Sequence, residues 1–155
     1  MIRAARHPCT SILGHPTGRL LLGREPYAID MDRVLDACAE CGCAIEINAN
    51  PHRLDLDWRL VRKAISLGIP IVIGPDAHSE RQLEYTRFGV DIARKGWARP
   101  ADVLNCRSWG IFSSSPKPKN PAAPCKRARV TPIPFSCRVF FASVHFRSPF
   151  RGSSF

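Results

Sequence analysis

The chain has 155 residues and a formal net charge of +10, which is compatible with one modest domain and with a nucleic-acid binder. The charge is unevenly distributed, because residues 1–106 hold 14 Lys and Arg with all 13 Asp and Glu, whereas residues 107–155 hold nine Lys and Arg and no acid. The sequence has no run of 18 apolar residues and no apolar signal segment near its start. We therefore expect a cytoplasmic protein without a membrane span or membrane partner.

The residue composition changes at the same boundary. Residues 107–155 contain seven of the 14 prolines and seven of the eight phenylalanines but no leucine, which is common in globular domains. We predict a compact domain over 1–106 and a disordered, basic, Pro-, Ser- and Phe-rich tail over 107–155. The tail is compatible with an arm that binds DNA, or with an extension translated from a shifted frame or a wrongly placed gene end. We favour the extension, because Leu, Asp and Glu vanish together.

The apolar pattern of the first part predicts strands that alternate with helices. This order is typical of a parallel sheet with crossover helices, and we therefore predict an α/β domain, either an open sheet or a barrel. Candidate helix caps at Asp30 and Gly42 support the first long helix. In chain order we expect a strand at 11–14, a helix at 30–41, a strand at 43–47, a helix at 57–67, a strand at 69–73, a helix at 79–95 and a short helix from 100 to 106.

Three cysteines lie close together at Cys38, Cys41 and Cys43. They could hold a metal ion, but no second CxxC or His pair follows at zinc-finger spacing. Cys38 and Cys41 also extend the apolar stripe of the predicted helix. We favour a buried structural role, since a free cysteine behaves as a small hydrophobic residue.

Polar residues follow each of the three predicted strands. In parallel α/β folds, ligands bind at the carboxyl ends of the strands. His and Asp are common metal ligands, so the pattern predicts a metal site for hydrolysis by a bound water. The sequence has neither a GxSxG nor a Walker A motif, so serine-hydrolase and P-loop chemistry lack support. The residues are His15, then Glu46 with Asn48 and Asn50, then Asp76 and His78.

Four longer sequence segments carry a resemblance to a known family. Together and in this order they closely resemble the PHP (polymerase and histidinol phosphatase) domain of bacterial family X DNA polymerases, and the likeness covers residues 1–106. Several long segments in one order are more specific than any single motif. The segments are ILGHPTGRLLL at 12–22, AIEINANPHRLDLDW at 44–58, GPDAHS at 74–79 and FGVDIARKGW at 88–97.

The resemblance implies a distorted (β/α)7 barrel with divalent metal ions at its strand ends, usually Mn²⁺ or Zn²⁺, with Mg²⁺ as a further candidate. It implies a metal-dependent phosphoesterase, a 3′-5′ exonuclease of DNA repair whose partners are DNA 3′ ends. His15 matches the metal ligand of the family's HP motif, and Asp76 and His78 match its terminal DxH pair. These three residues are the predicted catalytic metal ligands.

Four further residues are candidates for supporting roles in the same site. Glu46, Asn48 and Asn50 match a family word, and we expect them to orient the metal ligands or the substrate. Arg19 is a candidate phosphate contact, because a guanidinium binds phosphate through two hydrogen bonds. A simple surface role for Arg19 stays the alternative.

The chain also departs from the family pattern. The HxH word and further ligands that precede the HP motif in the family are missing, and His7 is followed by Pro8 and Cys9. We therefore expect the C-terminal half of a PHP barrel, with an exposed sheet edge, weak metal binding and little or no hydrolysis alone. The missing half could come from another chain.

Two other functions stay open. One is a small-molecule phosphatase of the PHP family, similar to histidinol phosphatase, because the predicted ligands do not separate a DNA ester from a small phosphate ester. The other is a fragment without catalysis that binds nucleic acid.

Overall fold

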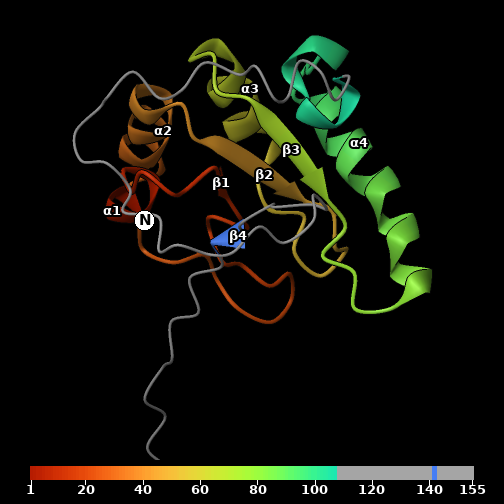
Figure 1. Ribbon diagram of the computed structural model, residues 1–155. Helices are drawn as coiled ribbons and strands as arrows, with labels where there is room; N and C mark the ends of the chain where they lie inside the picture. The colour runs from red at the N-terminus through yellow and green to blue at the C-terminus, as the bar shows by residue number, and fades with distance from the viewer. Residues whose placement is uncertain (108–140, 143–155) are drawn as a thin grey trace, which may run out of the picture.

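The computed structural model describes residues 1–107 and 141–142 of the chain (Figure 1). The predicted tail disorder therefore falls outside the described residues, apart from one short strand. None of the described helices is long and apolar enough to cross a membrane. The elements are α1 Ile2–Ala5, β1 Ile12–Leu13, α2 Met31–Cys41, β2 Ala44–Asn48, α3 Trp58–Ser66, β3 Ile71–Gly74, the 3₁₀ helix η1 Glu80–Tyr85, α4 Thr86–Lys95, the 3₁₀ helices η2 Pro100–Asp102 and η3 Leu104–Cys106, and β4 Phe141–Ala142.

The strands form one parallel sheet in the order β3-β2-β1-β4. This confirms the predicted α/β class with crossover connections between parallel strands. Ile45 on the central strand β2 pairs with Leu13 of β1 on one side and with Ile71 of β3 on the other. Over the described residues the sheet is open and does not close into a barrel.

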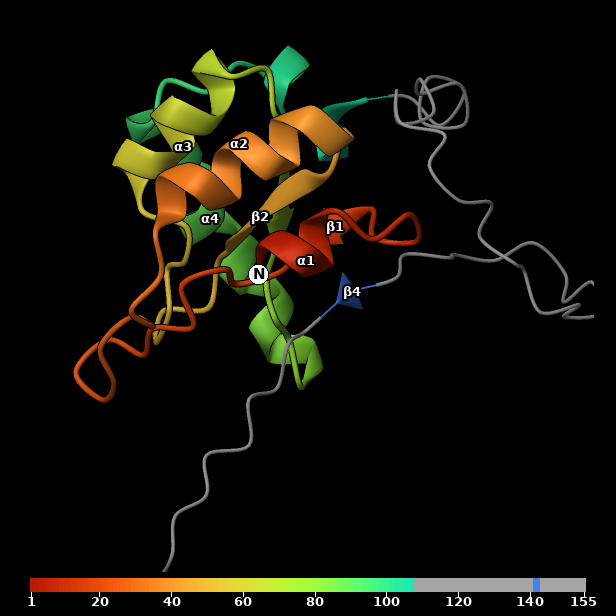
Figure 2. The same ribbon diagram turned by 90° about the vertical axis from the view of Figure 1, so that its left-hand side faces the viewer.

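Helix α2 begins and ends where local chemistry favours it. The Asp30 carboxylate accepts hydrogen bonds from the backbone N–H groups of Asp32 and Arg33, which the first turn leaves without helical partners. At the other end Gly42 adopts φ 66°, a left-handed angle that glycine tolerates without steric cost. Figure 2 shows the short helix α1 beside α2.

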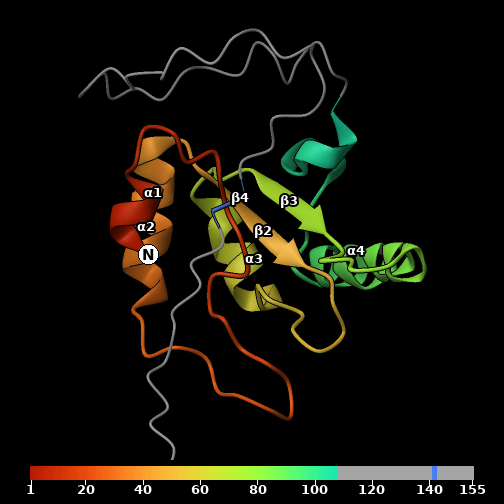
Figure 3. The ribbon, with the colours of Figure 1, turned by 60° about the horizontal axis from the view of Figure 1, so that its bottom comes forward.

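The hydrophobic core lies between one face of the sheet and the helices. Because side chains alternate along a strand, Ile45 and Ile47 of β2 face this core, whereas Glu46 lies on the opposite face. Helices α2, α3 and α4 surround β2 and β3 (Figure 3). The main core residues of the sheet and helices are Leu13, Val34, Leu35, Cys38, Ile45, Ile47, Val61, Ala64, Ile71, Ile73 and Ala93.

The cysteine cluster is part of this packing. Cys38 and Cys43 are buried and Cys41 is half-buried, and all three carry free thiols. A hydrogen bond with Cys43, together with burial, raises the pKa of Cys38. The Cys38 side chain is therefore a neutral, buried group, which agrees with the structural role that the sequence predicts.

The outer edge of β3 is closed by the chain that follows α4. The Asn105 side chain accepts a hydrogen bond from the Ile73 backbone N–H at 2.8 Å and donates one to the Ile73 carbonyl at 3.0 Å. Val103 forms a parallel bridge with Ile71. On the other side β4 pairs with β1. The expected open edge is thus covered in part on the β3 side, at Ile71 and Ile73, while β4 is the terminal strand on the other side of the sheet.

Replacing Asn105 by Ala should loosen this edge. The variant leaves the N–H and carbonyl of Ile73 without their partners, at a cost of about 1–2 kcal/mol in the free energy of unfolding. Native-state hydrogen exchange should be faster at the Ile73 amide. The Ile45 amide, which bonds to the Pro70 carbonyl inside the sheet, is the internal reference and should change less. Equal exchange of the Ile73 amide in both proteins would show that the two hydrogen bonds of Asn105, which we call the Asn105 clasp, do not stabilise this edge.

Candidate functional site at the strand exits

The exits of β1, β2 and β3 bring three of the predicted residues to one end of the sheet. The His15 backbone N–H donates a hydrogen bond to Oε2 of Glu46 at 2.7 Å. Gly74 ends β3 beside the same carboxylate, and a Cβ atom placed on it would lie only 2.4 Å from Oε1 of Glu46. Asp76 is close enough to act on the charge of Glu46. Glu46 is therefore the centre of the strand-exit cluster, which we define as His15, Glu46, Asn48, Asp55 and Asp76.

Glu46 is an unusual acid for a sheet interior. Its side chain is only 2% exposed. Burial raises the pKa of Glu46 to about 7, helped by the negative charges of Asp76 and Asp55, while the His15 N–H and the Asn48 side chain act in the opposite direction. Glu46 can consequently hold or release a proton close to neutral pH, which is a property that general acids and bases require.

Asp76 and His78 are close in sequence but differ in surroundings. Asp76 adopts a left-handed φ of 53° and its carboxylate pairs with Nε of Arg53 at 3.3 Å. His78 is exposed, and its Nδ1 lies 2.8 Å from the backbone carbonyl of Asp76. The His78 N–H donates to Oε1 of Gln82 at 2.6 Å. Asp76 is thus paired with the loop after β2, whereas the contacts of His78 are with Asp76 and with Gln82 of η1.

The donor types suit a divalent ion, but their arrangement does not form a complete site. Among the described residues, no group of three or more His, Cys, Asp or Glu side chains is placed to hold a metal ion. His15, Asp76 and His78 therefore do not assemble into a three-ligand centre here. The strand exits supply individual donors, and a metal site at this end of the sheet would need ligands from outside residues 1–107 or a rearranged loop.

Asn48 and Asn50 shape the loop after β2. Oδ1 of Asn48 accepts a hydrogen bond from the Asn50 N–H at 3.1 Å, and Oδ1 of Asn50 accepts one from the His52 N–H at 3.0 Å. These contacts are successive Asx turns, which fold a loop back on itself. The Nδ2 atom of Asn48 is buried and has no hydrogen-bond partner within the described part of the chain.

Asp55 is a buried residue that our sequence analysis missed. Its Oδ2 accepts hydrogen bonds from the N–H groups of Thr17 at 3.0 Å and Gly18 at 2.9 Å. Asp55 therefore joins the loop after β1 to the loop after β2. Burial raises the pKa of Asp55, although its contacts with Thr17 act against this shift. An acid between Leu54 and Leu56 was the sequence signal that could have indicated burial.

Arg19 makes contacts within the protein instead of presenting its guanidinium freely to solvent. Its Nε donates to the Arg53 carbonyl at 2.8 Å, and Nη2 donates to the Leu54 carbonyl. A weak ion pair with Asp57 at 4.0 Å adds to this. The guanidinium fastens the β2 loop to the loop after β1, so a phosphate contact would have to compete with these bonds.

Comparison with known proteins gives a partial match over this region. No family profile matches the chain. Over 97 residues it is 44% identical to the DNA polymerase/3'-5' exonuclease PolX of Bacillus subtilis, which covers 63% of this chain and 17% of PolX. The chain resembles one part of a family X DNA polymerase. This match confirms the resemblance to family X DNA polymerases that the four sequence segments indicate.

A second group of relatives consists of probable phosphatases. The chain is 33% identical over 84 residues to probable phosphatases of Thermoanaerobacter sp. and of Caldanaerobacter subterraneus, covering 50% of this chain. It spans about a third of each phosphatase, at 32% and 31%, and a still smaller share of the family X polymerase. The matched part of the chain is therefore similar to a segment of larger proteins.

Proposed function

We propose that this chain carries part of a metal-dependent phosphoesterase site, similar to the 3'-5' exonuclease of family X DNA polymerases. The observation that carries the proposal is the convergence of His15, Glu46 and Asp76 at the strand exits. The chain is also 44% identical to PolX over 97 residues. A histidine and two acids at one end of a parallel sheet provide the donor types that phosphate-ester hydrolysis with metal ions requires.

The rest of the ligand set should come from polypeptide that residues 1–107 do not contain. The donors described here do not form a complete metal centre. We assign no step of hydrolysis to this chain alone, and we expect it to bind Mn²⁺ weakly and to release few or no nucleotides from DNA 3′ ends. The isolated chain can be assayed in excess Mn²⁺. If it released nucleotides and the His78→Ala variant did not, the expectation of an incomplete metal site would be contradicted.

The proposal can be tested by grafting. In PolX of Bacillus subtilis, the 97 matched residues would be replaced by those of this chain, which restores the surrounding protein. The chimera should release 3′ nucleotides in Mn²⁺, and His78→Ala or Asp76→Asn should reduce the rate by at least about 100-fold, since each removes a ligand donor. The readout is nucleotide release from a 3′-recessed duplex.

His52→Ala is the matched control for this graft. His52 is exposed, and its hydrogen bonds within the described part of the chain, with Asn50 and Leu21, are made by its backbone. The control chimera should keep its rate within about twofold. A chimera that retains polymerase activity but lacks nucleotide release would contradict the proposed phosphoesterase role of these strand exits.

A small phosphate monoester is the second candidate substrate. The similarity to probable phosphatases of Thermoanaerobacter sp. and Caldanaerobacter subterraneus favours this candidate. The same chimera, given histidinol phosphate in place of the duplex, separates the two substrates. Faster release of inorganic phosphate than of nucleotides would favour the phosphatase function.

A further inference from the structure

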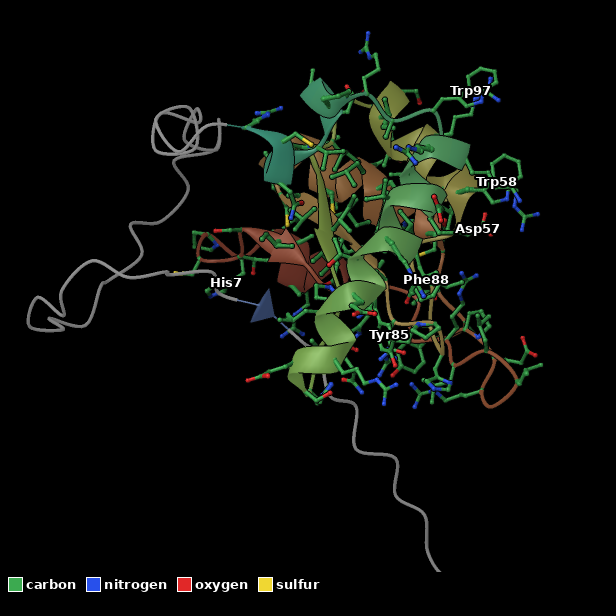
Figure 4. The ribbon with its side chains drawn as sticks, turned by 90° about the vertical axis from the view of Figure 1, so that its right-hand side faces the viewer. His7, Asp57, Trp58, Tyr85, Phe88 and Trp97 are labelled. Atoms are coloured by element: carbon green, nitrogen blue, oxygen red, sulfur yellow. The ribbon has the colours of Figure 1, made fainter. Side chains whose placement is uncertain are left out.

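A surface on α3 and α4 combines aromatic rings with positive charges. We define the aromatic–basic surface as Trp58, Arg59, Arg62, Lys95 and Trp97. Figure 4 shows Trp58 and Trp97 on the same side of the molecule, on α3 and just after α4. It shares no residue with the strand-exit cluster.

Cation–π contacts gather these five residues into two groups, one around each indole ring. The Arg62 guanidinium lies 3.9 Å from the ring centroid of Trp97. Over Trp58 lie Nζ of Lys95, at 5.3 Å from the centroid, and the guanidinium of Arg59, at 5.6 Å. Each indole ring therefore carries a cation on its face, which is a favourable cation–π arrangement.

The close approach of α3 to the end of α4 brings together the two segments that carry the tryptophans. Gly96 lies directly against α3, where a Cβ atom would come within 2.7 Å of Val61 and 3.0 Å of the Trp58 carbonyl. No larger residue fits at this contact without a shift. Because Trp97 follows Gly96 directly, this contact holds its backbone close to α3, and its ring meets Arg62 of that helix.

Trp97 has no role in the core that would account for it. Its side chain is 69% exposed, although tryptophan is usually buried for the most part. Its φ is 66°, in the left-handed region that is sterically unfavourable for bulky residues. The Ala98 N–H bonds to the Ala93 carbonyl across this turn, so the left-handed angle ends α4, and it is the exposure of the indole that indicates a surface role.

The charge of the patch indicates the chemistry of its partner. Arg59 pairs with Asp57 at 2.8 Å, whereas neither Arg62 nor Lys95 has a carboxylate within ion-pair distance among the described residues. Two unneutralised cations beside two exposed or half-exposed rings are complementary to a ligand that has both negative charge and flat apolar faces. Unpaired nucleotides have both properties.

We propose that the aromatic–basic surface binds single-stranded nucleic acid, with bases stacked on Trp97 and Trp58 and phosphates held by Arg62 and Lys95. The inference goes beyond the phosphoesterase proposal, because binding at this surface needs neither a metal ion nor the strand exits. A protein partner is the alternative, and the experiment below separates the two.

The test measures fluorescence anisotropy of a labelled oligothymidylate of about 12 nucleotides with the full 155-residue chain in EDTA. Trp97→Gly removes the ring and suits the left-handed backbone, so the fold should persist. This variant should raise Kd about tenfold, as expected for one lost stacking contact. Arg62→Gln should raise Kd about threefold and reduce the slope of log K against log salt by about 0.7.

Two controls isolate this surface from the general positive charge of the chain. Arg33→Gln removes one positive charge from the exposed face of α2 and should change Kd by less than about twofold. Inorganic polyphosphate has no bases, so its Kd should change less than about twofold in Trp97→Gly. If that variant unfolds, Trp97→Asn takes its place, because asparagine also tolerates this backbone angle.

Three results would overturn the inference. One is an oligothymidylate affinity of Trp97→Gly within about twofold of the parent chain. Another is an equal loss of affinity for oligothymidylate and polyphosphate, which would show that the ring only supports Arg62. The third is no effect of Arg62→Gln beyond that of Arg33→Gln. Each would leave a protein partner as the preferred occupant, and none depends on nucleotide release.

Discussion

Replacing Asp55 by Ala is expected to cost about 2–4 kcal/mol of unfolding free energy, because two buried N–H groups lose their acceptor. Thr17 and Gly18 both donate to Oδ2 of Asp55, and the residue is fully buried. No solvent reaches the site to replace these bonds. The contact between the loops after β1 and β2 should weaken, since the side chains of Asp55 and Arg19 both join these loops.

The measurement for Asp55 is urea unfolding followed by circular dichroism. Asp55→Asn should lose only about 1 kcal/mol, because its amide oxygen still accepts a hydrogen bond. Asp36→Ala, on the exposed face of α2, is the matched control and should change the unfolding free energy by less than about 0.5 kcal/mol. Equal losses in Asp55→Ala and Asp36→Ala would refute the proposed connection between the loops.

Glu46 should make the stability of the domain depend on pH. Burial raises its pKa from 4.5 to about 7 in the folded state. Between these two values the folded protein holds a proton that the unfolded chain releases. The contribution of Glu46 to stability is therefore fully present below pH 4.5 and is lost as the pH rises toward 7. The loss from this group amounts to about 3 kcal/mol.

Glu46→Gln should remove this part of the pH dependence. The glutamine oxygen can still accept the hydrogen bond from the His15 N–H, while the side chain stays neutral at all pH values. The variant should be more stable than the parent chain at pH 7 and of similar stability at pH 4.5. Urea unfolding in EDTA at both values tests this, with Glu40→Gln on exposed α2 as the control. A pH slope that Glu46→Gln leaves unchanged would contradict the prediction.

Features set by nearby residues could be predicted from the sequence. The helix expected at 30–41 is α2, Met31–Cys41, because Asp30 and Gly42 provide end signals that act within one turn. The strand expected at 43–47 is β2, one residue later. The helix expected at 79–95 begins instead as the 3₁₀ helix η1 and becomes α-helical at Thr86. Apolar periodicity does not distinguish these two helix types over a single turn.

Contacts between distant residues could not be predicted in this way. Asp55 meets Thr17 across 38 positions, and Asn105 meets Ile73 across 32. The contacts of Arg19 could not be predicted either, because its carbonyl partners lie in the loop after β2, far away in the sequence. Periodicity predicts which face of an element is buried but not which loop lies against it. The strand-exit residues were found because parallel topology alone brings them to the same end.

The Asn105 clasp has a consequence for any polypeptide that would complete the sheet. A new strand on the β3 side would need the same N–H and carbonyl of Ile73 that the Asn105 amide occupies. Docking on this side is therefore a competition in which one set of hydrogen bonds is exchanged for another. The association rate would be limited by how often the segment after α4 detaches, and Asn105→Ala should accelerate it.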